Sequence, residues 1–547
     1  MPSPPIQTGS DPVAGLRRHV LAAAAELDAD AEELNPTLER PPNPSMGDYS
    51  TNAALLLAPR LGQPPRELAA RFAESLGPRL GEDVERVEVA GPGFVNLFVS
   101  DAWLRRSVAT VIGSERFGVV AAGEGPVTLV EFVSANPTGP ITVASGRHAA
   151  YGDSLCRILE ATGSIVEREY YVNDAGGQVE RFAASIAARM SGAEPPEDGY
   201  QGDYIRVLAE GLAAEGIEPS ELAKLAERGV ASMLDGIRES LLRFRVIFDR
   251  FSSELALRES GAVEAVIEAL RGSGAVFESE GALWLRSSEF GDDKDRVLIR
   301  ASGEPTYLAP DIAYHRDKLE RGVGLMINVL GADHHGYVAR MRAALNALGA
   351  PAEVFEVEMM QLVNLLEAGE RSQMSKRRGE FTTLEQLLDD IGVDAARYFL
   401  LQRSHDTTLD LDLELARKRS NENPVYYVQY AHARIASLTR SALEGEARGG
   451  LSQAGIDIAV EPSERALIAR VLELPAQLGR AAREREPHLL AAYSRELAAD
   501  FHGFYRDCRV LGVEPDLEVA RLAVCDATRQ AIATSLDLLG IEAPESM

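Results

Sequence analysis

The sequence predicts an α/β protein built on a doubly wound, Rossmann-like parallel sheet. A β-rich apolar run, Val127–Val133, passes through a Gly- and Pro-containing turn into a helix-like stretch that begins near Ser145. A second apolar run, Leu325–Leu330, ends in a glycine-containing turn of its own. Strands that alternate with helices on both sides of an intervening segment are typical of a parallel sheet.

The chain on either side of this sheet predicts two further domains. Helical periodicity at Val13–Leu27 and an alternating strand at Ala90–Ser100 indicate a small α+β module. Between the two halves of the sheet we expect a mostly helical insertion, with a hairpin beginning near Ala275. The predicted bounds are 1–105 for the α+β module, 120–400 for the sheet domain with its insertion at about 182–295, and 401–547 for an all-helical domain.

From Thr383 onward the pattern is that of successive helices. Thr383 and Gln386 have the spacing of a capping box, in which each residue satisfies a free backbone N–H group at the start of a helix. Apolar residues recur at helical spacing in Leu467–Gly479 and Ala520–Gly540. The stretch around Gly450 is the expected surface loop.

The composition of the chain excludes several classes of protein. The 547 residues contain no apolar run of 18 and no N-terminal signal pattern, so we expect no contact with a membrane. Cys156, Cys508 and Cys525 lack the spacing of a zinc site or a disulfide framework, which favours a reducing cytoplasm. The net charge of −28 argues against a nucleic-acid ligand, but binding depends on local patches rather than on the sum.

The turn at Asn136–Pro140 is the first candidate site. It leads from a strand to a helix N-terminus, where free N–H groups and the helix dipole favour a phosphate. Bound nucleotides commonly lie at such a turn in open α/β sheets.

Eight blocks of sequence then resemble one family. SANPTGP at Ser134–Pro140, GADHHGY at Gly331–Tyr337 and QMSKRRG at Gln373–Gly379 are similar to motifs of class I aminoacyl-tRNA synthetases, most closely arginyl-tRNA synthetases. The resemblance implies ATP with Mg²⁺, L-arginine and tRNA(Arg) as partners, a monomer, and an anticodon-binding role for the helical domain. The remaining blocks are Gly146–Asp153, Tyr170–Gln178, Thr306–Lys318, Val393–Leu401 and Asn423–Arg434.

Two signatures depart from the family's pattern. The His-x-Gly-His signature is replaced by Thr142-Val143-Ala144-Ser145, and the first lysine of Lys-Met-Ser-Lys is Gln373. The resemblance implies that hydroxyl groups take the place of the two imidazoles beside the phosphates. His148 either supplies an imidazole there or lies at the surface, and the sequence favours the surface.

The resemblance also assigns residues to ligands. Glu131 and Asn136 are expected at the α-amino end of arginine, and Tyr307 with Asp311 at the guanidinium, whose five donors suit a carboxylate. Lys376 is expected to stabilise charge on the leaving pyrophosphate. The full expected sets are Lys376, Thr142 and Ser145 for catalysis; Pro140, Thr142, Ala144, Ser145, Gly146, His334, His335, Met374, Ser375 and Lys376 for ATP; Glu131, Ser134, Asn136, Tyr307 and Asp311 for arginine; Phe94, Asn96, Tyr426, Tyr430 and His432 for tRNA; and none for a metal.

Three functions are compatible with these residues. The leading hypothesis is an arginine–tRNA ligase. A specialised or inhibitor-resistant paralogue with slow activity is the first alternative, since the nucleotide turn is altered. A non-catalytic tRNA-binding or regulatory protein is the second, although it would have no reason to retain Glu131, Asp311 and Lys376.

Overall fold

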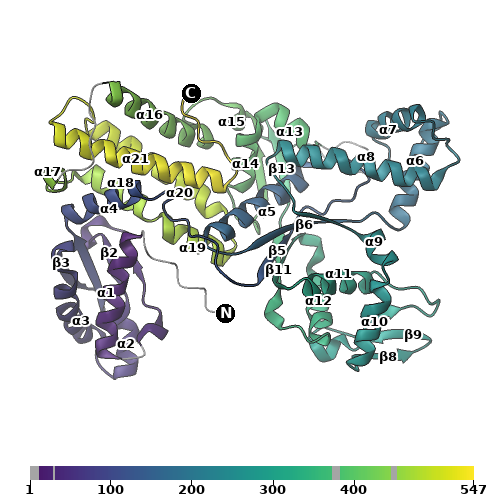
Figure 1. The fold of residues 1–547 in the computed structure, drawn as a ribbon, viewed down its shortest axis with the longest axis horizontal. Coiled ribbons are helices and arrows are strands. Elements are labelled where there is room, and N and C mark those ends of the chain that lie inside the picture. The colour runs from purple at the N-terminus through teal and green to yellow at the C-terminus, as the bar shows by residue number, and fades with distance from the viewer. Residues whose placement is uncertain (1–10, 29–30, 372–381, 445–452) are drawn as a thin grey trace.

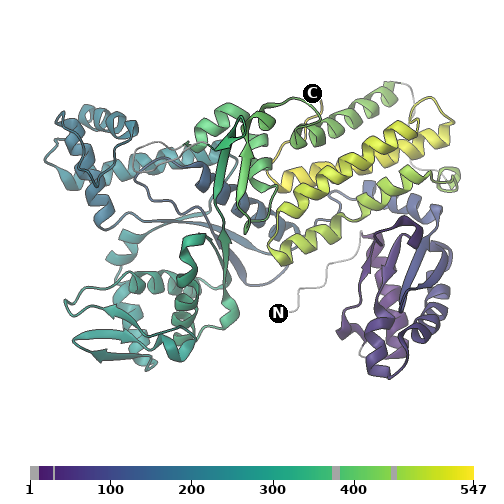
Figure 2. The same ribbon diagram turned by 180° about the vertical axis from the view of Figure 1, so that it is seen from behind.

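The computed structural model describes residues 11–28, 31–371, 382–444 and 453–547 (Figure 1). A central sheet joins a helical insertion and a mixed α/β lobe on one side to a long helical bundle on the other. The N-terminal module lies beneath this bundle, and the view from behind shows the same arrangement (Figure 2). No helix in the described ranges is long and apolar enough to cross a membrane. The three cysteines are buried and free.

The central sheet has five strands, all parallel, in the order β12-β11-β5-β6-β7. Alternate residues enter two different cores: Val130 and Ile327 pack with helix α5, whereas Leu129 and Met326 pack with α11 and α12. A parallel sheet covered on both faces is the predicted doubly wound fold. The elements are β5 (Val127–Glu131), β6 (Val166–Val172), β7 (Arg250–Ser253), β11 (Val323–Gly331), β12 (Phe355–Met360), α5 (Val143–Ala161), α11 (Leu308–Glu320) and α12 (His335–Ala347).

The stretch expected to form one insertion, about 182–295, is divided by a strand of the central sheet. Strand β7 pairs with β6 inside it, so a helical segment precedes β7 and a mixed segment follows. The hairpin expected near Ala275 is present as β8 and β9, to which β10 adds a third antiparallel strand. The two segments contain α6 (Gly177–Met190), α7 (Asp203–Ala214), α8 (Leu222–Arg243), α9 (Glu254–Glu259), α10 (Ala262–Gly272), β8 (Val276–Ser279), β9 (Ala282–Leu285) and β10 (Arg296–Ile299).

The N-terminal module is α+β, as predicted. Its four antiparallel strands follow the order β1-β2-β4-β3, and helices α1 and α3 pack together beside them. Helix α4 leaves this module and packs against α21 and α18 of the bundle, where Arg105 and Glu464 form a fully buried ion pair. The elements are α1 (Pro12–Leu27), α2 (Ala53–Leu61), α3 (Pro65–Leu80), α4 (Asp101–Gly113), β1 (Leu38–Glu39), β2 (Tyr49–Thr51), β3 (Val84–Ala90) and β4 (Phe94–Val99).

The C-terminal part begins with the predicted capping box. The Thr383 hydroxyl accepts from the Gln386 N–H group, and the Gln386 side chain accepts from the Thr383 N–H group. Two details differ from the prediction: β15 pairs in parallel with β13 within a segment expected to be helical, and α17 lies in the expected loop. The elements are β13 (Val363–Glu367), β14 (Glu370–Arg371), β15 (Leu409–Asp412), α13 (Leu384–Ile391), α14 (Val393–Leu401), α15 (Leu413–Arg417), α16 (Pro424–Glu444), α17 (Gln453–Ile456), α18 (Pro462–Leu472), α19 (Leu474–Glu484), α20 (His488–Asp507) and α21 (Pro515–Leu538).

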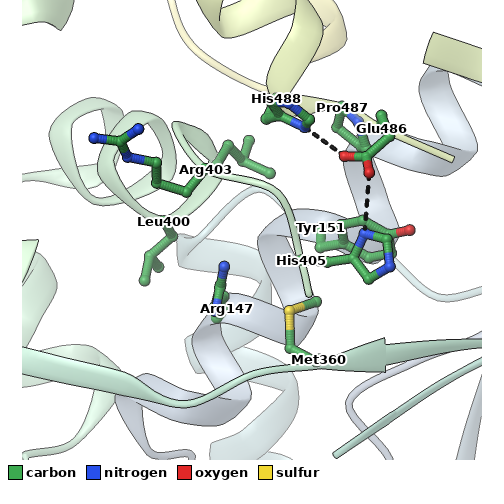
Figure 3. A pocket seen from close by; sticks show the side chains of 10 residues that line it. Arg147, Tyr151, Met360, Leu400, Arg403, His405, Glu486, Pro487 and His488 are labelled. Carbon is green, nitrogen blue, oxygen red and sulfur yellow. Dashed lines mark ion pairs between the residues drawn. The ribbon is translucent and has the colours of Figure 1, made fainter. Parts of the chain in front are cut away.

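The bundle meets the central domain at a cluster around Glu486 (Figure 3). The carboxylate of Glu486 pairs with His488 on one side and lies 3.9 Å from Nδ1 of His405 on the other. The Tyr151 hydroxyl of α5 donates to the Arg485 carbonyl over 2.7 Å. Helix α5 is therefore bonded directly to the corner between α19 and α20.

Candidate active site

A cavity of about 770 Å³ opens at the carboxyl ends of the parallel strands. Its wall is formed by the turn after β5, the first turns of α5, the end of β6, helix α11 and the end of β11. Tyr200 and Tyr204 of the helical insertion close one side. This edge of an open α/β sheet is where ligands of such folds bind.

The turn after β5 is held in a strained conformation. Val133 has φ 68° and Ser134 has φ 39°, which are uncommon for residues other than glycine, and for a β-branched residue in particular. The Ser134 N–H group donates to the Phe132 carbonyl over 2.9 Å and closes a tight three-residue turn. The Tyr171 N–H group donates to Ser134 Oγ over 3.1 Å, and the Tyr170 hydroxyl donates to the Ala135 carbonyl over 2.7 Å. Backbone strain that the neighbouring strand maintains is typical of binding sites.

Helix α5 begins at Val143, two residues before the predicted start, and Thr142 is its N-cap. The Thr142 hydroxyl accepts from the Ser145 N–H group at 3.4 Å, and the two hydroxyl oxygens also lie 3.4 Å apart. Thr142, Ser145, Pro140 and His148 all line the cavity. His148 is thus placed in the cavity wall, contrary to the surface position that the sequence favoured. Two hydroxyls and an imidazole lie at the positive end of the helix dipole.

Two other residues of the expected ATP set do not line this cavity. Gly146 is buried, and a Cβ atom there would lie 2.9 Å from Leu384 Cδ1, so its role is the close packing of α5 against α13. Ala144 is exposed. His334 lines the cavity, whereas the side chain of His335, the first residue of α12, is outside the described part of the structure.

The second signature, Met374, Ser375 and Lys376, also lies outside the described residues. The chain that follows it is anchored at the nucleotide turn. The Val143 N–H group donates to the Thr382 carbonyl over 3.2 Å, and the Leu384 N–H group donates to the Ile141 carbonyl over 2.8 Å. The segment 382–384, which follows the second signature in the sequence, is therefore joined by backbone hydrogen bonds to the start of α5.

Glu131, at the end of β5, is buried in a polar cluster. Its Oε2 atom lies 2.6 Å from the Lys318 ammonium and 3.2 Å from Asn328 Nδ2. Its Oε1 atom accepts from the Ser134 hydroxyl over 3.2 Å. Glu131, Ser134 and Asn136 line the cavity together, as expected for one end of an amino-acid site.

Asp311 lies in the first turn of α11 and lines the same cavity. Burial, followed by the nearby carboxylates of Glu254 and Glu131, raises its pKa to about 7, against the smaller opposing effects of Arg340 and Arg258. Within the described ranges Asp311 forms no ion pair. A largely buried carboxylate without a paired cation is a strong candidate for binding a cationic ligand.

Tyr307 does not join Asp311 in this conformation. The two were expected on one helical face, and Tyr307 is the N-cap of α11, where its carbonyl accepts from the Asp311 N–H group over 3.4 Å. The Tyr307 side chain is 80% exposed and does not line the cavity.

Several residues of the site were missed in the sequence. Tyr171, Tyr314 and Asn328 line the cavity, and Glu254 is a buried carboxylate close to Asp311. Asn328 had a detectable signal, because it is a lone polar residue within an apolar strand. Glu254 had a weaker one, because it directly follows β7, a strand too short to be predicted.

The residues expected to contact tRNA differ in accessibility. Phe94 is 39% exposed at the start of β4, whereas Asn96 is buried and accepts from the Ser50 hydroxyl over 2.7 Å. The half-buried rings of Tyr426 and Tyr430 stack with an interplanar angle of 7°. His432 is buried, and its Nδ1 bonds the carbonyl of Pro544 at 2.8 Å. In this conformation the His432 ring holds the C-terminal segment and is closed to a macromolecular ligand.

Three family models match the chain in sequence order. They are the arginyl tRNA synthetase N terminal domain at 14–99, the catalytic domain of tRNA synthetases class I (R) at 237–436, and the DALR anticodon binding domain at 428–547.

Relatives that align over nearly the whole chain are also arginine–tRNA ligases. The chain is 44% identical to an arginine–tRNA ligase of Carboxydothermus hydrogenoformans, with 98% of each chain covered. It is 43% identical to that of Shouchella clausii, covering 97% of this chain and 98% of the relative. The arginyl-tRNA synthetase structure of Thermus thermophilus superposes with a TM-score of 0.78 at 26% identity, covering 97% of this chain and all of the other.

Proposed function

Because the chain belongs to the arginyl-tRNA synthetases of class I, we propose that its cavity activates L-arginine with ATP and transfers it to tRNA(Arg). The relatives of the same length and domain order are arginine–tRNA ligases, which supports this activity. The observation that carries the substrate assignment is Asp311, a largely buried carboxylate without an ion pair in the described ranges.

Recognition of arginine follows from the two carboxylates in the cavity wall. We infer that Asp311 receives the guanidinium, whose planar donors pair well with a carboxylate. Glu254 lies close enough to Asp311 to raise its pKa, but its carboxylate already pairs with Arg258, so Asp311 is the main anion for this cation. Glu131 and Asn136 receive the α-ammonium at the other end.

The reaction joins the arginine carboxylate to the α-phosphorus of ATP. A carboxylate oxygen forms a bond to phosphorus, and the bond to the bridging oxygen breaks, so pyrophosphate leaves and arginyl-adenylate remains. A terminal hydroxyl of tRNA then attacks the arginyl carbonyl and releases AMP. Donors already in place at the start of α5 stabilise charge on the phosphates without reorganisation during the reaction.

Three side chains stabilise the negative charge that develops on the phosphates of ATP. Thr142 and Ser145 offer hydroxyl groups in place of the signature histidines, and both line the cavity. Lys376 supplies an ammonium, as the resemblance implies. Mg²⁺ would be held mainly by the phosphates and water, since the described residues contain no group of three or more His, Cys, Asp or Glu side chains that could hold a metal ion.

The tRNA contacts lie on the outer domains. Phe94 is accessible for stacking on an unpaired base, a common mode of RNA recognition. Tyr426 and Tyr430, on the first long helix of the bundle, support a contact on the anticodon side.

The test is aminoacylation of tRNA(Arg) by the purified protein with ATP, Mg²⁺ and labelled arginine. Charging by the wild type, together with loss of about 100-fold or more in the Lys376→Ala variant, supports the ligase and the role of Lys376. Lys224→Ala is the matched control, because Lys224 pairs with Glu221 at the surface. Tight binding of tRNA without any charging would instead support the non-catalytic alternative.

A further inference from the structure

Asn328 lines the cavity next to Glu131, at the proposed ammonium end of the arginine site. It is on β11, directly opposite Glu131 of β5 in the parallel register, and it is 2% exposed. Its Nδ2 atom lies 3.2 Å from Glu131 Oε2 and 3.2 Å from His315 Nε2. One amide group therefore links a residue proposed for substrate binding to a buried imidazole.

The protonation of His315 can be assigned from its surroundings. Burial, followed by the Lys318 ammonium, lowers the pKa of His315 to about 3, so the ring is neutral near pH 7. Its Nδ1 atom lies 2.8 Å from the Asp311 carbonyl oxygen, which can only accept a hydrogen bond. The proton is therefore on Nδ1, and Nε2 is an acceptor.

This assignment fixes the orientation of the Asn328 amide. The Glu131 carboxylate and the His315 Nε2 atom both need a donor, and the NH₂ group of asparagine has two hydrogens to give. A flipped amide would place its carbonyl oxygen against two acceptors. The Asn328 Oδ1 atom is consequently held in place, buried and without a hydrogen-bond partner within the described part of the chain.

A buried acceptor of this kind is costly unless a ligand satisfies it. We propose that Asn328 Oδ1 accepts a hydrogen bond from the α-ammonium of bound arginine, with His315 acting as the positioning residue that holds the amide. The α-ammonium is the group concerned because Asn328 is the strand partner of Glu131, where the proposed function places that end of the substrate. The inference thus rests on the proposed function and adds a residue to its amino-acid site.

The test measures arginine binding to the full chain by titration calorimetry without ATP, for the wild type and for Asn328→Leu and Asn328→Ser. Loss of a hydrogen bond to a charged group predicts binding about 10- to 100-fold weaker in both variants. Asn364→Leu is the matched control, because Asn364 is half-buried on β13 and donates to Asp410 away from the cavity. A folded Asn328 variant that binds arginine as tightly as the wild type would overturn the inference.

Two comparisons test which part of arginine Asn328 contacts and whether His315 positions its amide. With 5-guanidinopentanoate, which lacks the α-amino group, the affinity of the Asn328 variants should match that of the wild type. An equal loss of affinity for both ligands would refute the assignment to the ammonium.

The second comparison concerns His315. The His315→Gln variant retains an acceptor and should preserve arginine affinity, whereas His315→Leu should weaken it; equal behaviour of these two variants would refute the positioning role. A wild type that binds no arginine would instead reject the proposed function.

Discussion

Asp311 makes arginine affinity dependent on pH. Its pKa of about 7 in the ligand-free protein means that the carboxylate is half protonated near neutrality. A guanidinium binds the ionised form, so binding must first remove the proton below pH 7. The measured dissociation constant therefore rises above its limiting value by the factor 1 + 10^(pKa − pH).

The magnitude follows from the value of the pKa. The factor is about 11 at pH 6, about 2 at pH 7 and about 1.1 at pH 8, so affinity should fall about tenfold between pH 8 and pH 6. At pH 7 about half a proton should be released for each arginine bound. His315 does not contribute in this range, because its pKa of about 3 keeps it neutral throughout.

Titration calorimetry in buffers of different ionisation enthalpy measures both quantities. Asp311→Asn should weaken binding about 10- to 100-fold and abolish the pH dependence, because the amide neither titrates nor carries charge. Asp317→Asn is the matched control on the same helix, where Asp317 is half-exposed and pairs with Arg321. Wild-type affinity that stays constant from pH 6 to pH 8, with no proton released, would refute the reasoning.

The raised pKa of the Asp311 carboxyl also predicts that the thermal stability of the protein depends on pH. Burial raises the pKa of Asp311 from 3.8 to about 7, so the stability of the ligand-free protein falls as the pH rises from about 4 to about 7 and does not change further through this group above pH 7. Asp311→Asn should therefore raise the melting temperature of the ligand-free protein at pH 8 but have a much smaller effect near pH 4, where the native carboxyl is protonated and the unfolded carboxyl is about half protonated. A lower melting temperature of the variant at pH 8 would contradict this account.

Three further changes test the packing and the nucleotide turn. Arg105→Ala leaves the buried Glu464 with only the longer ion pair to Arg521, at 4.0 Å, so the free energy of unfolding should fall by up to about 3–5 kcal/mol in denaturant titrations; a loss below about 1 kcal/mol would refute the importance of the Arg105 pair. Gly152→Ala places a Cβ atom 2.2 Å from Phe132 Cγ, so α5 must move from β5; a variant with unchanged melting temperature and ATP affinity would show that the contact relaxes freely. Ser145→Ala should lower kcat for pyrophosphate exchange about tenfold, and an unchanged kcat would remove Ser145 from the catalytic set.

Local patterns in the sequence predicted most elements correctly. The capping box of Thr383 and Gln386 depends only on residues three apart, and it forms as predicted. Strands β7 and β15 were missed because each has four residues, and their partners β6 and β13 lie far away in the sequence. Pairing over such distances leaves little trace in the periodicity of a short segment.

The site could be predicted in part. The strand–turn–helix around Pro140 placed Thr142, Ser145 and Glu131 at one cavity because adjoining segments of chain form it. Tyr307 was predicted together with Asp311, but its exposed side chain does not line the cavity, which spacing along the chain could not show. The side chains that face each other across the cavity come from separate strands and helices, so their distances were not available from spacing along the chain.

The sequence by itself determined the family, the order of domains and the position of the nucleotide turn, because motifs and periodicity are local properties of the chain. Only the tertiary structure decided that His315 is neutral and that, among the residues the structure describes, Asp311 has no paired cation and Asn328 Oδ1 has no hydrogen-bond donor. Burial and hydrogen-bond partners arise from segments brought together in space. The same residue type can therefore be a salt-bridged surface group or a binding group, depending on what folds against it.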